Sequence, residues 1–356
     1  MKITMVEYQG RHDEHGEAIG HAPKVLRDYA RYIREDFSVE VFAPDCIFES
    51  VGKSEVFEKK TLKHAICMKS GKSVFLRLKE KIGMFQNISQ ALKQAEGDVI
   101  WFFNIEFYLM LYLALHKKQK KCVVCTLFQD HFPGGKVAKI KQSVFEKAQK
   151  KMDFIIATGP QLQFANCDSK FLPDYACDEK KYSKYRTEEK NGETVILGTM
   201  GVEKELEEAV QTYTSLNLPL TIAGRFHDKD RLSKLKALAG EKITFRDEYL
   251  SEEEYLALLG KSSYVLLPYS PKRYESQTSG VLQESIFVGT IPVAYEKVLS
   301  GNGVPGIGFS GWNTLSLELL QKDQEAIYQG LENVRETVYG EESLRQNLRE
   351  IFTSKE

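Results

Sequence analysis

The stretch 263–294 constrains the fold most, because it predicts a strand, a loop, a helix and a second strand in direct succession. Tyr264–Pro268 is a short apolar, β-branched run closed by proline, which is typical of a buried strand. The polar segment 270–278 contains a proline and predicts a loop. A helix is expected from 279 to its terminal glycine at 289, and 291–294 predicts the next strand.

The start of this helix could bind phosphate. Thr278 and Ser279 precede Gly280, so backbone N–H groups are accessible beside the positive end of the helix dipole. Glu284 follows about a turn and a half later, where a carboxylate can accept hydrogen bonds from ribose hydroxyls. The alternative is an ordinary strand–helix–strand unit with a capped helix.

The same alternation recurs along the chain, and it predicts the α/β class. Strands are expected at 2–8, 39–43, 99–103, 122–127, 154–157, 194–197, 220–223, 243–246 and 249–250, and helices at 18–33, 107–116, 137–152, 206–216, 231–238, 251–259, 324–338 and 342–352. Strands that alternate with helices form mostly parallel sheets wrapped by helices. A length of 356 residues suits two such domains. We expect a Rossmann-like domain over 1–173, a linker over 174–192, a second Rossmann-like domain over 193–323 and closing helices over 324–356.

Composition is that of a globular protein, with 42% hydrophobic and 28% charged residues. No apolar run is long enough to span a bilayer, and the first residues lead into a strand rather than a signal peptide. A cytoplasmic location is expected, and the six scattered cysteines fit reduced thiols.

The net charge of −1 conceals an asymmetry between the two halves. Residues 1–173 contain 27 Lys and Arg against 20 Asp and Glu, or +7, and the remainder contains 22 against 30, or −8. The basic half could meet an anionic partner such as a lipid-linked acceptor at a membrane, or the lysines could simply be solvated.

The helix predicted over 137–152 has the same two interpretations. Lysines surround an apolar stripe there, formed by Val137, Ile140, Val144, Ala148 and Met152.

The stretch 263–294 resembles the donor-nucleotide motif of GT-B glycosyltransferases, particularly family 4. In that motif two glutamates lie eight residues apart, and the helix that follows ends in Gly-Thr/Lys-Pro-Val. The matching residues here are Glu284, Gly289, Thr290, Pro292 and Val293, with Ile291 as one extra residue. The first glutamate is out of register, because Ser276 stands at its position and Glu275 is one residue early. A loop absorbs such a shift, so the role passes to Glu275.

The resemblance implies a GT-B fold, in which two Rossmann-like domains face each other across a cleft and the last helix crosses back to the first domain. It also implies retaining, metal-independent transfer of a sugar from a nucleotide-diphosphate donor, of the UDP or GDP type, to a glycan or lipid-linked acceptor of polysaccharide assembly. No cofactor and no nucleic acid is implied. Peripheral membrane contact would use the basic helix 136–151.

Site residues follow from the same resemblance. For the donor, Glu284 would hold the ribose and Thr278, Ser279 and Gly280 the phosphates, with Glu275 near the sugar. The family's arginine is replaced by Thr199, so Lys204 and Arg225 would neutralise the diphosphate. In the first half, His15 and Gly16 lie in the first loop and Asp130 follows the strand 122–127, where they could contact the acceptor or a phosphate. His131, next to Asp130, is with Glu275 a candidate catalytic residue. Exposed histidines and a turn-capping aspartate are the alternatives.

Two other motifs carry no chemistry. Cys122 and Cys125 form a CxxC inside a predicted strand, where the two side chains face opposite sides. Asp228 and Asp230 form a DxD triplet at a helix start, which capping explains. Two alternative functions stay open: a sugar-nucleotide 2-epimerase of the same fold, and a nucleotide-sugar-binding subunit without catalysis, which the departures at Thr199 and Ser276 favour.

Overall fold

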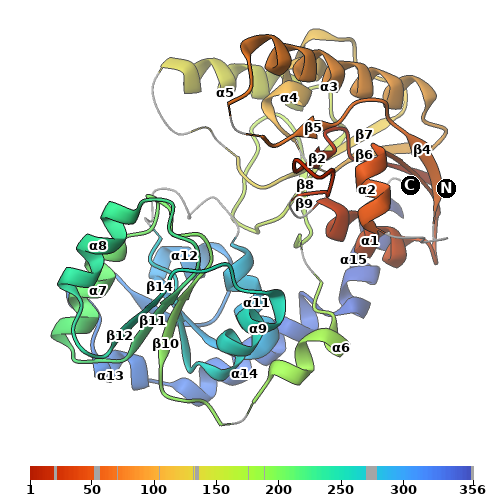
Figure 1. Cartoon of the computed structure of the whole chain (residues 1–356). Helices are drawn as coiled ribbons and strands as arrows, with labels where there is room; N and C mark the ends of the chain where they lie inside the picture. Colours follow the sequence, from red (N-terminus) through yellow and green to blue (C-terminus); the bar gives the residue numbers. More distant parts are fainter. Residues whose placement is uncertain are drawn as a thin grey trace. The chain divides into compact units, whose positions relative to one another are not determined.

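A computed structural model describes residues 1–19, 22–51, 57–69, 71–103, 105–130, 132, 136–174, 176–187, 189–269 and 279–353. The chain divides into two compact units (Figure 1). The first contains residues 1–158, 162–174 and 344–356, and the second contains 159–161 and 175–343.

A seven-stranded parallel sheet forms the centre of the first unit. Its strand order is β4 (Glu58–Thr61), β3 (Ser38–Ala43), β1 (Lys2–Val6), β6 (Val99–Phe102), β7 (Cys122–Leu127), β8 (Phe154–Ala157) and β9 (Ser169–Phe171). Helices cover parallel sheets on both faces, so central strands become continuously apolar. All four residues of β6 are accordingly buried.

The helices of the first unit are α1 (Ala22–Ile33), α2 (Asp45–Val51), α3 (Val74–Gln94), α4 (Phe107–Leu115), α5 (Lys136–Gln149) and α15 (Glu341–Thr353). Helix α4 packs between α3 and α5 (Figure 1). Phe352 of α15 lies 5.3 Å from Trp101 between ring centroids, which places this C-terminal helix in the core of the first unit. Strands β2 (Arg11–His12) and β5 (Ile66–Cys67) form a separate small parallel sheet.

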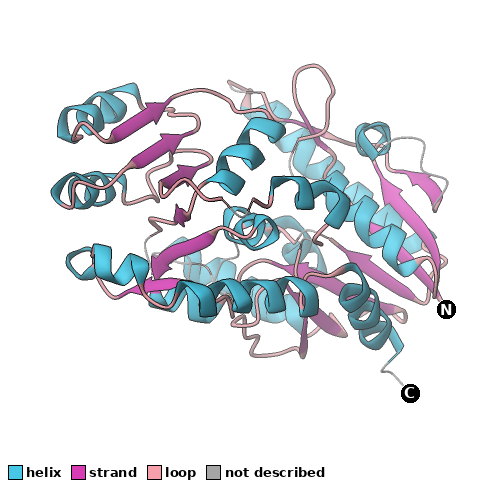
Figure 2. Cartoon of the chain, turned by 90° about the horizontal axis from the view of Figure 1, so that it is seen from below, coloured by secondary structure: helices cyan, strands magenta, loops and turns pink. Residues whose placement is uncertain are grey.

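A six-stranded parallel sheet forms the centre of the second unit, and helices flank it (Figure 2). The strand order is β12 (Ile243–Arg246), β11 (Leu220–Ala223), β10 (Thr194–Leu197), β13 (Tyr264–Leu266), β14 (Ile291–Tyr295) and β15 (Ile307–Phe309). The helices are α6 (Glu179–Tyr182), η1 (Ser183–Tyr185), α7 (Leu206–Ser215), α8 (Lys229–Leu238), α9 (Glu252–Lys261), α11 (Gly280–Val288), α12 (Glu296–Gly301), η2 (Trp312–Thr314), α13 (Leu317–Gln321) and α14 (Gln324–Thr337).

Most of the predicted elements are present, but several predictions were wrong. The first helix begins at Ala22 rather than Ala18, because Ala18 forms a bridge with His12. The strand expected at 249–250 is not formed. The segment 174–192, expected as a linker, contains α6 and η1, and its Tyr182 is buried against Phe287 within the second unit.

The prediction of a buried apolar stripe on the helix 137–152 was also wrong in part. Val137 and Ile140 are exposed, whereas Ala138, Phe145 and Ala148 of α5 face the core. Helix α3 and strand β4 were not predicted at all. No helix within the described ranges combines the length and apolar character that a bilayer-spanning segment needs.

Candidate functional site

The candidate site of the second unit lies where the strand order of its sheet reverses. From β10 the chain moves to β11 and β12 on one side, whereas β13, β14 and β15 lie on the other. Ligands of open parallel sheets bind outside the carboxyl ends of the strands at such a reversal. Here the loops after Leu197 of β10 and Leu266 of β13 meet at this point, because Lys204 forms an isolated bridge with Tyr269.

The loops after β10 and β11 approach each other so closely that only glycine fits between them. Gly224 has φ +145°, and a Cβ atom there would lie 1.9 Å from the carbonyl oxygen of Gly198. The neighbouring backbone is also joined, since the Met200 amide donates to the Arg225 carbonyl at 3.1 Å.

A pocket of about 260 Å³ opens beside these loops. Thr199 and Arg225 line it from the loops after β10 and β11, and Tyr249, Leu250 and Tyr255 line it from the segment after β12 and from α9. The carboxylates Glu248 and Glu252 also line it, so charges of both signs surround an aromatic and apolar wall. Such a lining at a strand-order reversal suits a nucleoside.

Glu284 of α11 lies next to Tyr255, one of the two tyrosines of this pocket. The Tyr255 hydroxyl is buried, and its pKa is raised well above the ordinary value by burial and by the Glu284 carboxylate. Burial, and after it the Glu284 charge, also raises the pKa of Tyr182. The Glu284 carboxylate therefore lies behind Tyr255, whose side chain lines the same pocket as Arg225.

Lys204 is a buried cation at the same edge, with only 5% of its surface exposed. Its Nζ donates to the Leu197 carbonyl at 2.7 Å and lies 5.9 Å from the Tyr269 ring centroid. No carboxylate of the described residues forms an ion pair with this ammonium group. Burial lowers the pKa of Lys204 to about 8, against a smaller opposing effect of Glu203.

Tyr269 connects this lysine to the start of α11. Its hydroxyl lies 3.0 Å from Ser279 Oγ, and Ser279 caps the helix by accepting from the Leu282 amide. Gly280 is the first residue of the helix, and Gly289 ends it with φ +66° as predicted. Ammonium group and helix N-terminus thus share one small region, which is a suitable environment for a diphosphate.

Glu275, Thr278 and His131 lie outside the described residues. The other predicted donor residues, Lys204, Arg225, Ser279, Gly280 and Glu284, all lie in the second unit at the carboxyl edge of its sheet. Sequence reasoning missed Tyr255 and Tyr269. For Tyr269 the one available signal was its position directly after Pro268, at the end of a predicted strand. Nothing in the sequence distinguished Tyr255 from other tyrosines in helices.

The remaining predicted residues belong to the first unit. His15 is exposed, and Gly16 has φ +87° in a turn organised by Asp13, which accepts from the His15 and Glu17 amides. Asp130 accepts from the Gln163 amide at 3.1 Å, so it holds the backbone of another loop. In the second unit, Asp228 of the DxD triplet caps α8 by accepting from the Arg231 amide at 2.9 Å.

Glu7 is a further candidate in the first unit that sequence reasoning did not identify. It follows β1, next to the reversal of strand order between β1 and β6, and only 2% of it is exposed. Burial raises the pKa of Glu7, and Oε1 accepts from the Gln9 and Gly10 amides. Oε2 has no partner among the described residues, so it could accept from a substrate hydroxyl.

No protein-family model and no curated protein sequence matches the chain. Solved structures do. HepE of Anabaena, in complex with UDP and glucose, is 13% identical, with 99% of this chain and 100% of that chain covered and a TM-score of 0.65. AviGT4, a glycosyltransferase involved in avilamycin A biosynthesis, is 12% identical over 98% and 96%, with a TM-score of 0.58. A putative UDP-N-acetylglucosamine 2-epimerase of Listeria monocytogenes is 13% identical over 100% and 97%, with a TM-score of 0.58.

At these identities the likeness shows the fold. The predicted GT-B fold is confirmed, since the chain has two Rossmann-like units with parallel sheets and matches GT-B structures over nearly its whole length. The narrower resemblance to family 4 stays a prediction.

Proposed function

We propose that the chain is a glycosyltransferase that takes a sugar from a nucleotide-diphosphate donor of the UDP or GDP type. The observation that carries the proposal is the buried ammonium of Lys204, which has no carboxylate partner among the described residues and lies beside the N-terminus of α11. A cation that is held in this way without an anion is prepared for one. The UDP bound in the HepE structure supports the same ligand class.

Each donor residue then has a role. Lys204, with Arg225 in place of the missing family arginine, neutralises the diphosphate, to which Thr278, Ser279 and Gly280 donate hydrogen bonds. Glu284 accepts from the ribose hydroxyls. Negative charge grows on the diphosphate oxygens as the glycosidic bond breaks, so donors fixed there stabilise the transition state more than the ground state. One well-placed donor of this kind contributes about 3 kcal/mol.

The finer parts of the proposal concern stereochemistry and acceptor. Retention of configuration without a metal ion follows from the resemblance alone, with Glu275 near the sugar, His131 as a further catalytic candidate, and His15, Gly16 and Asp130 on the acceptor side. The acceptor is a glycan or lipid-linked intermediate of polysaccharide assembly. The protein would act in the cytoplasm, with the basic helix 136–151 as a peripheral contact to the membrane.

A sugar-nucleotide 2-epimerase is the second candidate, and the Listeria structure favours it. Both functions need the same donor site, but an epimerase releases a changed nucleotide-sugar and needs no acceptor.

A ligand screen followed by product analysis tests the proposal. Thermal shift with UDP-, GDP- and ADP-sugars should raise the melting temperature with one class of nucleotide. Chromatography of the reaction mixture then distinguishes free nucleoside diphosphate, expected from transfer, from an epimerised sugar nucleotide. The absence of any nucleotide-dependent shift would refute the donor site, and binding without turnover on any acceptor would indicate a binding subunit.

A further inference from the structure

Helix α3 is much longer than the strands it covers. Its 21 residues extend about 31 Å, whereas the four residues of the following strand β6 extend about 13 Å. The helix ends directly before β6, so its C-terminal half lies along the sheet, where Met84, Ile88 and Ala91 are buried. Its first two turns therefore extend past the carboxyl edge of the sheet.

These overhanging turns expose apolar side chains. They are Val74, Phe75, Leu76 and Leu78, and Ile82 continues the exposed apolar set at the start of the third turn. Phe75 is 78% exposed, and the turns are held as a helix because Ser73 caps them by accepting from the Leu76 amide. An exposed apolar cluster on an ordered helix indicates a binding surface.

Basic residues alternate with this apolar cluster. Arg77, Lys79 and Lys81 are exposed there. Lys72 and Glu80, the single acid of residues 71–82, form an ion pair at 2.5 Å, and their side chains are only 9% and 14% exposed. The start of α5 has the same character, because Val137 and Ile140 are exposed between Lys136, Lys139 and Lys141.

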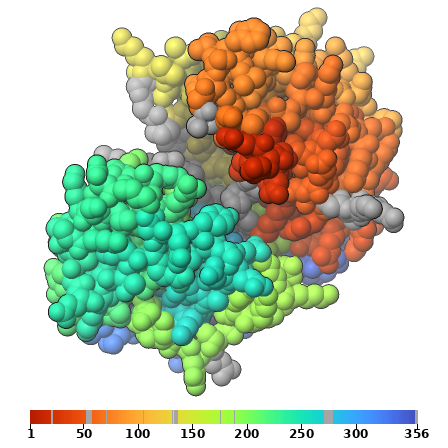
Figure 3. Space-filling model, in the orientation of Figure 1, coloured from red at the N-terminus to blue at the C-terminus, as the bar shows by residue number. Residues whose placement is uncertain are grey.

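The two patches approach each other at the start of α4. Lys81 of α3 lies over the Tyr108 ring at 5.3 Å, and Lys141 of α5 lies over the neighbouring Phe107 ring at 5.8 Å. In Figure 3 the orange atoms of the α3 region and the yellow atoms of the α5 region both reach the upper margin of the unit. We call this combined surface, formed by residues 72–82 and 136–141, the α3–α5 tip.

We propose that the α3–α5 tip binds the surface of an anionic membrane. Apolar side chains that insert between acyl chains, with lysines and arginines at the level of anionic headgroups, are the complement of such a surface. A protein partner is disfavoured, because the buried centres of protein interfaces are depleted in lysine, and here lysines alternate with the apolar residues.

The position of the α3–α5 tip also indicates which class of acceptor the protein uses, and this inference rests on the proposed function. Strand β5 leads from the small sheet toward α3, and its partner β2 belongs to the first loop. The Met68 amide donates to the His12 carbonyl at 2.7 Å, so the loop that carries His15 and Gly16 is bound to the base of the tip. A membrane at the tip would bring this loop to the headgroup level, which assigns a lipid-linked acceptor rather than a free glycan.

Vesicle co-sedimentation of the full chain tests the surface directly. The wild type should bind vesicles of equal parts phosphatidylcholine and phosphatidylglycerol, and bind phosphatidylcholine alone much less. Phe75→Ser with Leu78→Ser should weaken binding about tenfold or more, and Arg77→Gln with Lys79→Gln should weaken it at low salt. Leu115→Ser is the matched control, since Leu115 is 69% exposed at the other end of α4.

Three results would overturn the proposal: no binding of the wild type to anionic vesicles, equal loss of binding in Leu115→Ser, or a wild-type dimer in sedimentation velocity that Phe75→Ser with Leu78→Ser dissociates. The last would assign the tip to self-association. All substituted residues are exposed, and an unchanged melting temperature confirms that the variants fold. Vesicle binding needs no nucleotide, so vesicle binding without any nucleotide binding would refute the proposed function and leave the membrane surface standing.

Discussion

The Nζ of Lys204 donates to the carbonyl oxygen of Leu197 at 2.7 Å, which ties a buried cation to the end of the strand where the sheet order reverses. The hydrogen bond holds the ammonium in place, but it does not neutralise the charge. A site of this kind lowers stability in exchange for affinity toward an anion.

Lys204→Met should separate these two effects. Removing a poorly compensated buried charge should leave the free energy of unfolding unchanged or raise it by about 1–2 kcal/mol, while affinity for the nucleotide-sugar falls at least about tenfold. Urea unfolding and calorimetric titration measure the two quantities. Lys234→Met, an exposed lysine on α8, is the charge-matched control. A variant that loses stability but binds normally would contradict the assignment.

Donor binding should depend on pH through the same lysine. Burial lowers the pKa of Lys204 to about 8, so below this pH the free protein already has the cation that a diphosphate needs. Above it the lysine must take up a proton to bind, and affinity should fall by up to about tenfold per pH unit. The folding equilibrium has the opposite trend: between pH 8 and the unfolded value of 10.5 the unfolded chain binds more protons, so stability rises with pH. Affinity that stays flat from pH 7 to 10 would refute the role.

Glu284 should be detectable through the sugar of the nucleoside. Glu284→Gln should weaken UDP-sugar binding by about tenfold, because a charged acceptor is lost. The sharper measurement compares UDP with its 2′- and 3′-deoxy analogues. The wild type should prefer the ribose form, and the variant should lose that preference. Equal preference in both proteins would mean that the carboxylate does not contact the ribose.

Gly224→Ala should disrupt the site from the backbone. Its Cβ would lie 1.9 Å from the Gly198 carbonyl oxygen, so the loops after β10 and β11 must separate. We expect a loss of about 3 kcal/mol or more in the free energy of unfolding, together with loss of nucleotide binding. Gly192→Ala is the control, because Gly192 also has a positive φ but no atom lies within 4 Å of where its Cβ would be. This substitution should lower the free energy of unfolding by about 1 kcal/mol. Similar losses of stability in the two variants would show that the positive φ, and not the contact with Gly198, causes the destabilisation.

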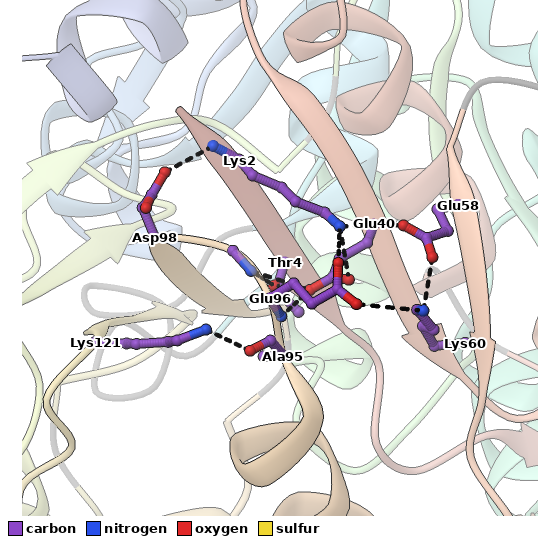
Figure 4. Close-up of polar contacts among 10 residues, drawn as sticks. Lys2, Thr4, Glu40, Glu58, Lys60, Ala95, Glu96, Asp98 and Lys121 are labelled. Atoms are coloured by element: carbon purple, nitrogen blue, oxygen red, sulfur yellow. Dashed lines mark hydrogen bonds and ion pairs between the residues drawn. The ribbon is translucent and has the colours of Figure 1, made fainter.

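A charge cluster in the first unit provides a prediction about stability. Glu40 is fully buried, and Lys2 lies 3.3 Å from it while also pairing with Glu58 and Glu96 (Figure 4). Lys2→Met would remove the cation that forms an ion pair with the buried Glu40 carboxylate, and it should lower the free energy of unfolding by about 3 kcal/mol. Lys60→Met removes a cation whose ion pairs within the described residues are with the exposed acids Glu58 and Glu96, and it should cost less than about 1 kcal/mol. The two urea midpoints give the comparison.

The sequence by itself determined the fold, because parallel strands and their helices are encoded by short local patterns. Tyr264–Leu266, the helix start at Ser279 and its glycine end at Gly289 lie where apolar runs, capping and left-handed backbone require them. The carboxyl ends of parallel strands share one edge, so the same patterns predict where donor residues would gather, and their roles stay predictions.

Only the tertiary structure decided how the site is connected and which helix reaches solvent. The contact of Tyr255 with Glu284, the link from Lys204 through Tyr269 to Ser279, and the burial of Glu7 all join residues far apart in the chain, where no local pattern specifies a partner. Helix α3 has apolar residues in both halves. Its first turns are exposed because the helix is longer than β6 and extends past the end of the sheet. Burial is a property of the packed sheet and not of the residue, so it could not be read from sequence.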